Sequence, residues 1–481
     1  GLTRAPLVTR LLGILPVEVE TIALEDAESR EDFLFTVGRR AVARLAPALR
    51  TYQGEAIPDW VSLYHWALRN APAQLDNILR GRFPEAAESS LPPALARRLY
   101  LRNQRLTGSV TRFENFYACP FRHFAQYGLR LTERPVRQFA APDFGTLLHD
   151  VMRRFGERMQ AAKRRWGEVG EAECHALCDA IMAEEAPRVQ NEILLSTAQY
   201  QHLQLRIAQT AESSLSRLIA YDKQSAFQPR FFEIGFGENS PVGSLVHYPL
   251  GDGCTLDVVG QIDRVDVGRL EDAGSLYFLV IDYKTGYADL SMDEVYYGLR
   301  LQLLTYVLAA SRLLKGQTAA QKPAGMLYCF LKNPAQEGKT AGFSQSDACA
   351  TLWKNLRMAG WLLDDEAVVR GIDAENRFVK ISFKKDGSLS AASRERVKTL
   401  EEMRQLLRYT SHQLEAAGKA ITAGQIGVSP YRWGQRHACA YCLYRDLCGF
   451  DLKLPGSAYR DLSDRADVWG DMAARMEGRE E

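Results

Sequence analysis

The sequence contains no long apolar run, few cysteines and no excess of charge of either sign. No stretch of about 18 apolar residues is present, so we expect no membrane-spanning helix, and there is no secretory signal pattern. Nine cysteines in 481 residues are too few for a disulfide scaffold, and their odd number fits a reducing compartment such as the cytoplasm. Sixty basic against 59 acidic residues exclude a histone-like polycation but leave room for a local basic groove.

The rest of the composition is that of a globular protein with more than one domain. Hydrophobic residues make up 46% of the chain and charged residues 25%, which are not the proportions of a disordered chain. A length of 481 residues exceeds one ordinary core, so we expect two or three domains. The chain begins with Gly1 rather than Met, and we therefore expect a fragment or a processed chain.

Three segments differ in character along the chain. Residues 1–105 have helical periodicity with breaks at prolines and no catalytic constellation, residues 106–455 carry the functional motifs, and residues 456–481 form a polar tail. Between Arg97 and Arg137 there are nine arginines, no lysine and two acidic residues. This basic segment is either a surface that faces phosphates or an ordinary solvated helix face. Arginine suits phosphate binding, but a GC-rich genome produces the same abundance of arginine.

The order of elements in the middle segment predicts an α/β fold. Helical spacing extends over residues 144–221 and 295–314, and mainly over residues 346–418, where a short strand-like piece stands at 378–383. Runs rich in β-branched and aromatic residues predict strands at Phe231–Phe236, Leu256–Val267, Leu276–Tyr283 and Gly325–Leu331. Helix, three strands, helix and strand together predict a mixed sheet flanked by helices.

The sharpest local signal is the pair Asp282 and Lys284, which follows the apolar run Leu276–Ile281. Alternate residues of a strand point to the same face, so these two side chains project together. Asp263 stands on the preceding strand, and Glu233, on the first strand, offers a third carboxylate. Carboxylates from neighbouring strands can hold a hard divalent cation, and a lysine beside them can offset charge that develops on a phosphate. An isolated Asp-x-Lys is most often a surface ion pair, but the second motif favours chemistry.

Four motifs, in this order and spacing, resemble the RecB-type branch of the PD-(D/E)XK nucleases. They are Phe144–His149 (FGTLLH), Gly260–Arg264 (GQIDR), Asp282–Gly286 (DYKTG) and Gln302–Tyr306 (QLLTY). The resemblance implies a PD-(D/E)XK nuclease core with large helical additions, in which His149, Asp263 and Asp282 bind Mg²⁺ or Mn²⁺. It also implies that Lys284 serves catalysis of phosphodiester hydrolysis. Further active-site residues would be Glu233, Gln302 and Tyr306, of which the last two share a helical face.

Cysteines on both sides of this nuclease core form a candidate metal-binding set. Cys439, Cys442 and Cys448 have the spacing C-x2-C-x5-C, and Cys119 lies 320 residues before the first of them. Four thiolates can hold an iron–sulfur cluster or a tetrahedral zinc ion, and the spacing alone leaves both open. One cysteine before the core and three after it resemble the arrangement that binds a 4Fe–4S cluster in RecB-type nucleases. The resemblance implies a structural staple rather than a redox centre.

The residues around Cys119 extend the resemblance to the AddAB family of helicase–nucleases. Ser109–Phe121 (SVTRFENFYACPF) and Tyr127–Leu131 (YGLRL) are similar to the beginning of a nuclease domain in that family, and the resemblance covers about residues 109–450. It implies an exonuclease acting on single-stranded DNA ends during double-strand break processing, with an AddA-like helicase–nuclease subunit as partner. The candidate DNA contacts are then Arg112, Arg122 and Arg130.

Two other functions compete with this interpretation. A stand-alone single-strand DNA exonuclease of the same superfamily would cleave robustly without a partner, whereas a non-catalytic DNA-binding scaffold would bind without cleaving. The segment Asn333–Thr340 ends like a phosphate-binding loop but has Asn333 where the first glycine is required. We therefore expect no ATP binding by this chain.

Overall fold

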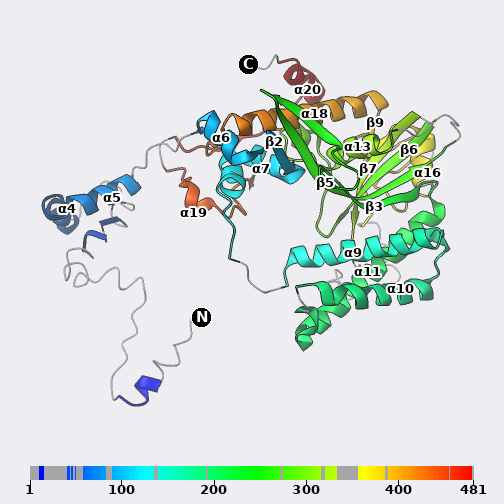
Figure 1. Ribbon diagram of the computed structural model, residues 1–481, viewed down its shortest axis with the longest axis horizontal. Coiled ribbons are helices and arrows are strands. Elements are labelled where there is room, and N and C mark those ends of the chain that lie inside the picture. Colours follow the sequence, from blue (N-terminus) through cyan, green and yellow to red (C-terminus); the bar gives the residue numbers. More distant parts are fainter. Residues whose placement is uncertain are drawn as a thin grey trace. The chain divides into compact units, whose positions relative to one another are not determined.

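The structure is a computed structural model of the chain, shown in Figure 1. It describes residues 10–15, 41–43, 45–46, 49, 58–82, 89–134, 139–190, 193–270, 275–315, 320–332, 356–384, 388–453 and 456–478. The chain divides into two compact units, of which the first comprises residues 1–87 with 453–456 and the second comprises residues 88–452 with 457–481. None of the described helices is long and apolar enough to cross a membrane.

The first unit is helical in its described part, in agreement with its sequence periodicity. Helix α4 (Pro58–Asn70) packs against helix α5 (Pro72–Arg82). Their shared core includes Leu63, Ala67 and Leu75, all buried. Both helices begin with a proline, which fits the first turn of a helix because its amide would have no partner there.

The second unit is built on a mixed sheet that has nine strands among the described residues. The strands follow one another in space as β1-β2-β5-β6-β7-β8-β9, with β3 and β4 also paired to β5. Their bounds are β1 Leu101–Arg102, β2 Arg105–Ser109, β3 Gln228–Phe236, β4 Val246–Gly251, β5 Cys254–Gly268, β6 Ser275–Lys284, β7 Ala320–Phe330, β8 Ala359–Leu363 and β9 Val397–Lys398. Strand β5 organises this sheet, because its first half pairs with β2 and β4 and its second half with β3 and β6.

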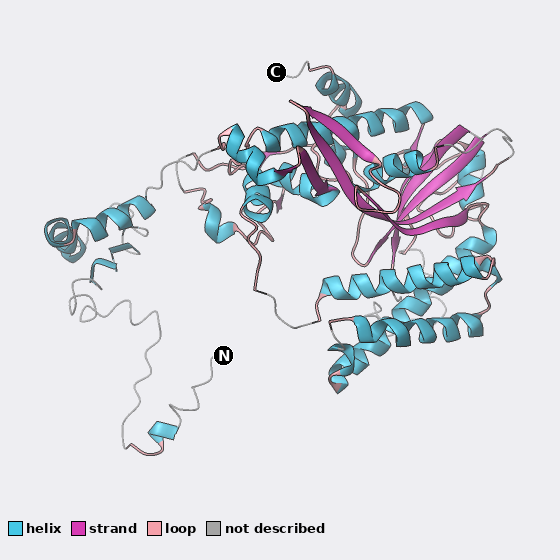
Figure 2. Ribbon diagram, viewed as in Figure 1, coloured by secondary structure: helices cyan, strands magenta, loops and turns pink. Residues whose placement is uncertain are grey.

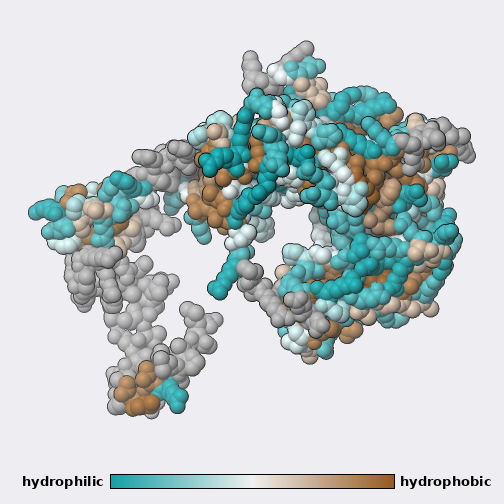
Figure 3. Space-filling view, viewed as in Figure 1, coloured by the Kyte–Doolittle hydropathy of each residue, from teal (hydrophilic) through white to brown (hydrophobic). Residues whose placement is uncertain are grey.

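Helices cover both faces of the sheet, as Figure 2 shows. On one face lie α9 (Ala141–Ala161), α10 (Glu171–Glu185) and α11 (Ala198–Gln224), and hydrophilic residues cover much of the visible surface of this layer in Figure 3. The other face carries α6 (Pro93–Tyr100), α7 (Val110–Ala118), α13 (Gln302–Leu313) and α18 (Leu400–Thr422). Shorter helices are α8 Pro120–His123, α12 Met292–Tyr296, α16 Glu366–Ile372, α17 Ala391–Arg394, α19 Arg445–Cys448 and α20 Val468–Met476.

The central strand β6 shows why the two helical layers need different residues. Leu279 and Ile281 pack into the core beneath α9–α11, whereas Phe278 and Val280 pack into the core beneath α13 and α18. Alternation is the ordinary geometry of a strand, and burial on both faces requires an unbroken apolar run. The run ends at Asp282, where the sheet reaches the polar site.

The predicted order of helices and strands in residues 144–331 is confirmed, and strand β4 adds to it. The helical prediction for residues 346–418 was wrong in one place, because Ala359–Leu363 forms the buried strand β8. Such a short apolar run has no visible period, so a strand and a buried helix look alike in sequence. The strand-like piece at 378–383 makes only isolated bridges. The segment Asn333–Thr340 lies outside the described residues.

The limits of the second unit differ from those expected from the sequence. The unit begins at residue 88 rather than 106, because α6 contributes the buried residues Ala96 and Tyr100 to the core around α7. Residues 457–481 also belong to it. Helix α20 buries Met472 in the same core, and β12 (Arg460–Asp461) joins a small sheet with β10 (Tyr431–Trp433) and β11 (Arg436–His437).

Candidate active site

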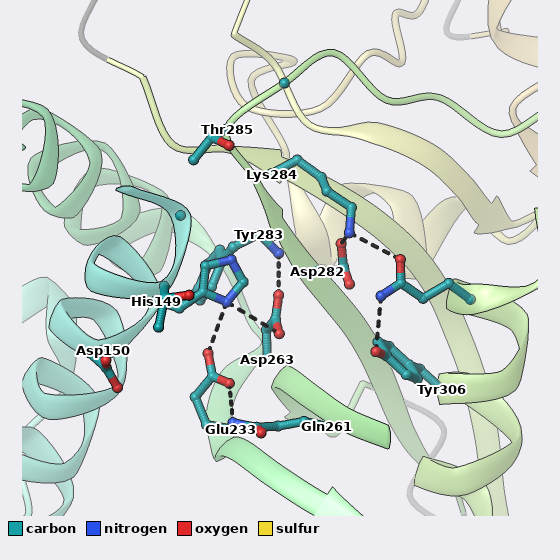
Figure 4. Close-up of a pocket in the computed structure, with 14 residues that line it drawn as sticks. His149, Asp150, Glu233, Gln261, Asp263, Asp282, Tyr283, Lys284, Thr285 and Tyr306 are labelled. Atoms are coloured by element: carbon teal, nitrogen blue, oxygen red, sulfur yellow. Dashed lines mark hydrogen bonds and ion pairs between the residues drawn. The ribbon is translucent and has the colours of Figure 1, made fainter. Parts of the chain in front are cut away.

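One open cavity of about 490 Å³ collects residues from all four sequence motifs (Figure 4). It lies where β5 and β6 meet β3, the first turns of α9 and the start of α13. The residues that line it are Gly145, Thr146, His149, Asp150, Glu233, Gln261, Asp263, Asp282, Tyr283, Lys284, Thr285, Gly286, Gln302 and Tyr306. Side chains separated by more than 150 positions thus share one polar pocket.

The pair at the end of β6 has the geometry that the period of a strand predicts. Lys284 Nζ lies 2.6 Å from Asp282 Oδ2, and Asp282 is 1% exposed. Burial raises the pKa of the Asp282 carboxyl to about 7; the neighbouring Asp263 raises it further, and Lys284 opposes the rise. Lys284 keeps 28% of its side chain exposed towards the cavity, so its ammonium group can reach a second anion.

A histidine and two carboxylates form the second group in the cavity. His149 Nδ1 lies 3.2 Å from Glu233 Oε1 and 3.5 Å from Asp263 Oδ1. One ligand atom from each of these residues falls within 4.8 Å of the other two, which is the spacing of a metal site. Burial opposes a charge on the ring, but the contacts with Asp263 and Glu233 outweigh it and raise the pKa of His149 to about 10. A proton on His149 therefore occupies the position that a cation would take.

The backbone aims two of these carboxylates. Asp263 Oδ2 accepts a hydrogen bond of 2.6 Å from the amide of Tyr283 on the neighbouring strand. Glu233 has a φ of +44°, an unusual value for a residue other than glycine and one that costs free energy. Its other oxygen, Oε2, accepts a hydrogen bond of 2.6 Å from Gln261. The strain at Glu233 thus coincides with a carboxylate that is held towards His149.

The helix after the catalytic strand contributes a hydrogen-bonded chain. Lys284 Nζ donates to Gln302 Oε1 at 3.0 Å, and Gln302 Nε2 donates to the hydroxyl of Tyr306 at 2.9 Å. Gln302 and Tyr306 therefore share the helix face that their spacing predicts, and this face is turned to the active site. Their contact with Lys284 limits the directions in which the ammonium group can point.

Glu114 is a functional residue that sequence reasoning missed. It lies on α7, five residues before Cys119, and its Oε1 accepts hydrogen bonds from the amides of Leu301 at 2.7 Å and Gln302 at 3.2 Å. A carboxylate at the start of α13 satisfies amides that have no partner within the helix. Its distance of 187 positions from Leu301 leaves no local signal in the sequence.

Arg264, inside the second motif, takes no part in the site. It is fully buried and makes a bidentate pair with Asp266, with Nε–Oδ1 at 2.6 Å and Nη2–Oδ2 at 2.8 Å. Its guanidinium lies over the ring of Trp166 at 4.7 Å. Because it neighbours Asp263 on the strand, it faces the opposite side of the sheet.

The four cysteines singled out in the sequence line one small cavity in the second unit. Cys119 follows α7, and Cys439, Cys442 and Cys448 precede or belong to α19, with no disulfide between them. Burial, aided by the neighbouring thiols, raises the pKa of Cys439 and of Cys448. Four thiols that crowd each other in this way form a donor set for a soft metal centre.

The three candidate DNA-contact arginines lie in two places. Arg122 lines the cysteine cavity, whereas Arg112 and Arg130 line a separate pocket between α6, β2 and the residues after α8. Arg130 is exposed, but Arg112 is only 9% exposed.

Comparison with known proteins gives a consistent family. Residues 107–449 match the family described as the PD-(D/E)XK nuclease superfamily. Curated proteins named as the B-type subunit of an ATP-dependent helicase/deoxyribonuclease are similar to this chain: those of Desulforamulus reducens and Desulforudis audaxviator are each 34% identical over 97% and 96% of it, and that of Bacillus licheniformis is 33% identical over 96%. The matches cover 41%, 40% and 40% of those proteins, so this chain spans about two fifths of their length. The resemblance inferred from the motifs is confirmed at this level.

Proposed function

This chain belongs to the PD-(D/E)XK nuclease superfamily, and on that premise we propose that it is the nuclease part of an AddB-type subunit. Its activity would be the hydrolysis of phosphodiester bonds at DNA ends. The observation that carries this proposal is the convergence of all four motifs on one cavity, with Lys284 beside Asp282 and Asp263 beside His149. A scaffold that only binds DNA has no need for this arrangement of buried carboxylates around a lysine.

We assign a divalent cation, Mg²⁺ or Mn²⁺, to the cavity. His149, Glu233 and Asp263 lie close enough to share one ion, and Asp282 is the fourth candidate ligand. Carboxylate oxygens are the donors that such hard cations prefer. When bound, the ion lowers the pKa of water and polarises a phosphoryl oxygen. The ion would replace the proton that His149 holds, because both neutralise the same carboxylates.

The roles of the other residues follow from their contacts. Lys284 is placed to stabilise negative charge on the phosphate as it forms, since its ammonium group is partly exposed to the cavity. Gln302 holds Lys284 in position and is in turn held by Tyr306. Orientation of this kind contributes to catalysis because the lysine does not have to be ordered during the reaction.

We propose that the four cysteines hold a 4Fe–4S cluster rather than zinc. In a tetrahedral zinc site with bonds of about 2.3 Å, the sulfur atoms lie roughly 3.8 Å apart. Among the described residues, no three of these sulfur atoms form a group within 4.8 Å. That wider spacing supports a larger centre. A link between residues 320 positions apart also restricts the unfolded chain, which supports a structural role.

The partner and the substrate are part of the same proposal. The relatives' name joins a helicase with a deoxyribonuclease, which supports an AddA-like helicase–nuclease as the partner and the single-stranded ends of broken DNA as substrate. The reaction would take place in the cytoplasm, beside the chromosome of a bacterium. A partner that feeds the strand predicts weak activity of this chain alone, whereas a stand-alone exonuclease would be fully active.

The first experiment is degradation of end-labelled single-stranded DNA with Mg²⁺ by the wild type and by Asp282→Ala and Lys284→Ala. Equal iron content would be confirmed in all samples, and Lys163→Ala, at an exposed turn after α9, would be the matched control. Cleavage by wild type and control, with loss in both active-site variants, is the expected result. Equal cleavage by all four samples would indicate a contaminating nuclease and overturn the proposal. Absence of cleavage in all samples, even with the partner added, would favour the scaffold.

A further inference from the structure

A second pocket, outside the active site, is rimmed by arginines. It has a volume of about 350 Å³. The residues that line it are Leu99, Tyr100, Arg102, Arg105, Thr107, Arg112, Gln126, Tyr127 and Arg130. They come from α6, β1, β2, α7 and the turn after α8, segments that pack side by side (Figure 1). No acidic residue is among them.

Arg112 at this pocket is a buried cation with no carboxylate beside it. Its Nε donates to His123 Nε2 at 3.1 Å and one terminal nitrogen donates to the Thr107 carbonyl at 2.7 Å, both neutral partners. Its guanidinium lies 4.9 Å from the ring centre of Tyr127 and 5.6 Å from that of Tyr100. A buried charge without a counter-ion is costly, so the site is completed by an anion from outside.

The rim of the pocket adds positive charge that is open to solvent. Arg102 and Arg130 are exposed, and the structure gives neither side chain an ion-pair partner among the described residues. Arg105 is the exception, because its guanidinium pairs with Glu238 at 2.5 Å. The hydroxyl of Tyr100 is buried at the pocket without a hydrogen-bond partner in the described part of the chain. The pocket therefore offers several donors and no competing carboxylate.

Arginines interleaved with aromatic rings are the chemistry that binds single-stranded nucleic acid, because guanidinium groups bind phosphates and rings pack against bases. The strand β5 connects this pocket to the active site. Thr107, in the pocket, pairs with Asp257 of β5, and Asp263 stands six residues further along that strand. Six residues of extended strand span at most about 20 Å, and stacked nucleotides rise about 3.4 Å each. One strand of about six nucleotides can contact both sites.

We propose that the arginine pocket is a binding subsite for single-stranded DNA, holding a phosphate and its nucleotide a few positions from the scissile bond. The inference rests on the proposed function in one respect, since the strand it holds is the one that the active site cleaves. The basic segment of the sequence thus has a specific place of contact rather than a uniform charged face.

The test is binding of a fluorescein-labelled 20-nucleotide oligo(dT), followed by anisotropy in EDTA, where no cleavage interferes. The variants are Arg102→Glu with Arg130→Glu, and Arg112→Met; Lys163→Glu is the control of matched charge change. We expect the double variant to raise Kd about tenfold or more and to lower the slope of log K against log salt by about 1.4, as two lost phosphate contacts would. The control should remain within twofold of the wild type.

Three outcomes would overturn the proposal. The first is a double variant that binds within twofold of the control. The second is labelled dTMP binding as tightly as the oligonucleotide, which would assign the pocket to a free nucleotide. The third is Arg112→Met that folds, by its circular dichroism, and binds normally while the rim variants do not. Because the readout is binding without metal, absence of cleavage by the wild type would count against the proposed function and not against this subsite.

Discussion

The two pockets on strand β5 have opposite charge. The active-site cavity beside its second half gathers four carboxylates around one lysine, whereas the pocket beside its first half gathers four arginines and no carboxylate. A carboxylate-rich site repels DNA until a cation is bound, and an arginine-rich site attracts it at all times. The comparison indicates a division of work, in which one pocket supplies affinity and the other supplies chemistry.

The largest expected effect comes from loss of the cysteine-bound centre, because helix α7 serves both pockets. Arg112 and Glu114 lie on α7, and Cys119 follows it directly. Cys119→Ser with Cys439→Ser should abolish iron binding and lower the free energy of unfolding by about 5 kcal/mol, the cost of releasing a loop of this length. Urea unfolding and iron analysis measure the two effects. A double variant without iron and with unchanged stability would contradict the staple.

The second effect separates chemistry from affinity. Asp282→Asn should reduce the rate of single-strand cleavage on the order of 10³-fold, because it removes a buried carboxylate that faces both Lys284 and the proposed cation. Binding of oligo(dT) in EDTA should not weaken, since one negative charge near the strand is lost. Single-turnover rates and anisotropy check the two halves. Weaker binding together with slower cleavage would show that the two pockets are not independent.

The third effect compares two buried arginines. Arg264→Met leaves Asp266 buried without its partner and should cost about 3–5 kcal/mol of stability. Arg112→Met leaves no carboxylate unpaired, so only neutral hydrogen bonds are lost, at a cost of about 2 kcal/mol or less. Urea unfolding of the two matched variants decides. Equal destabilisation would mean that Arg112 is a structural residue rather than part of an anion site.

The smallest effect concerns the link from α7 to the active site. Glu114→Gln retains an acceptor for the amides of Leu301 and Gln302 but loses the charge at the start of α13. We expect a loss of about 1 kcal/mol in stability and a fall in kcat of roughly threefold to tenfold, with KM nearly unchanged. Steady-state kinetics separate the two constants. Glu114→Ala should have a larger effect, and a change confined to KM would contradict a positioning role.

Features with a local period could be predicted from the sequence, and features set by strand pairing could not. The position of Asp282 and Lys284 on one face follows from the period of two in β6, and that of Gln302 and Tyr306 from a helical turn. Glu233 was the least secure candidate because its carboxylate meets His149 only after β3 pairs with β5.

The remaining surprises have the same origin. Glu114 reaches Leu301 across 187 positions, which no local pattern encodes. The arginines between residues 97 and 137 resemble one basic segment in sequence, but Arg97 pairs with Asp252, Arg122 lines the cysteine cavity and Arg112 lies in a pocket. The composition of that segment was correctly recognised as basic, while its division among three sites depends on the tertiary fold.

The left-handed backbone at Glu233 has a consequence for the history of such domains. Glycine would adopt this conformation without strain, so glutamate at this position is maintained against the stability of β3. In a descendant that no longer cleaved DNA, nothing would offset that cost. We therefore expect inactive copies of this domain to acquire glycine or asparagine at position 233 early, while the buried Arg264–Asp266 pair persists, so this one position would record the loss of activity.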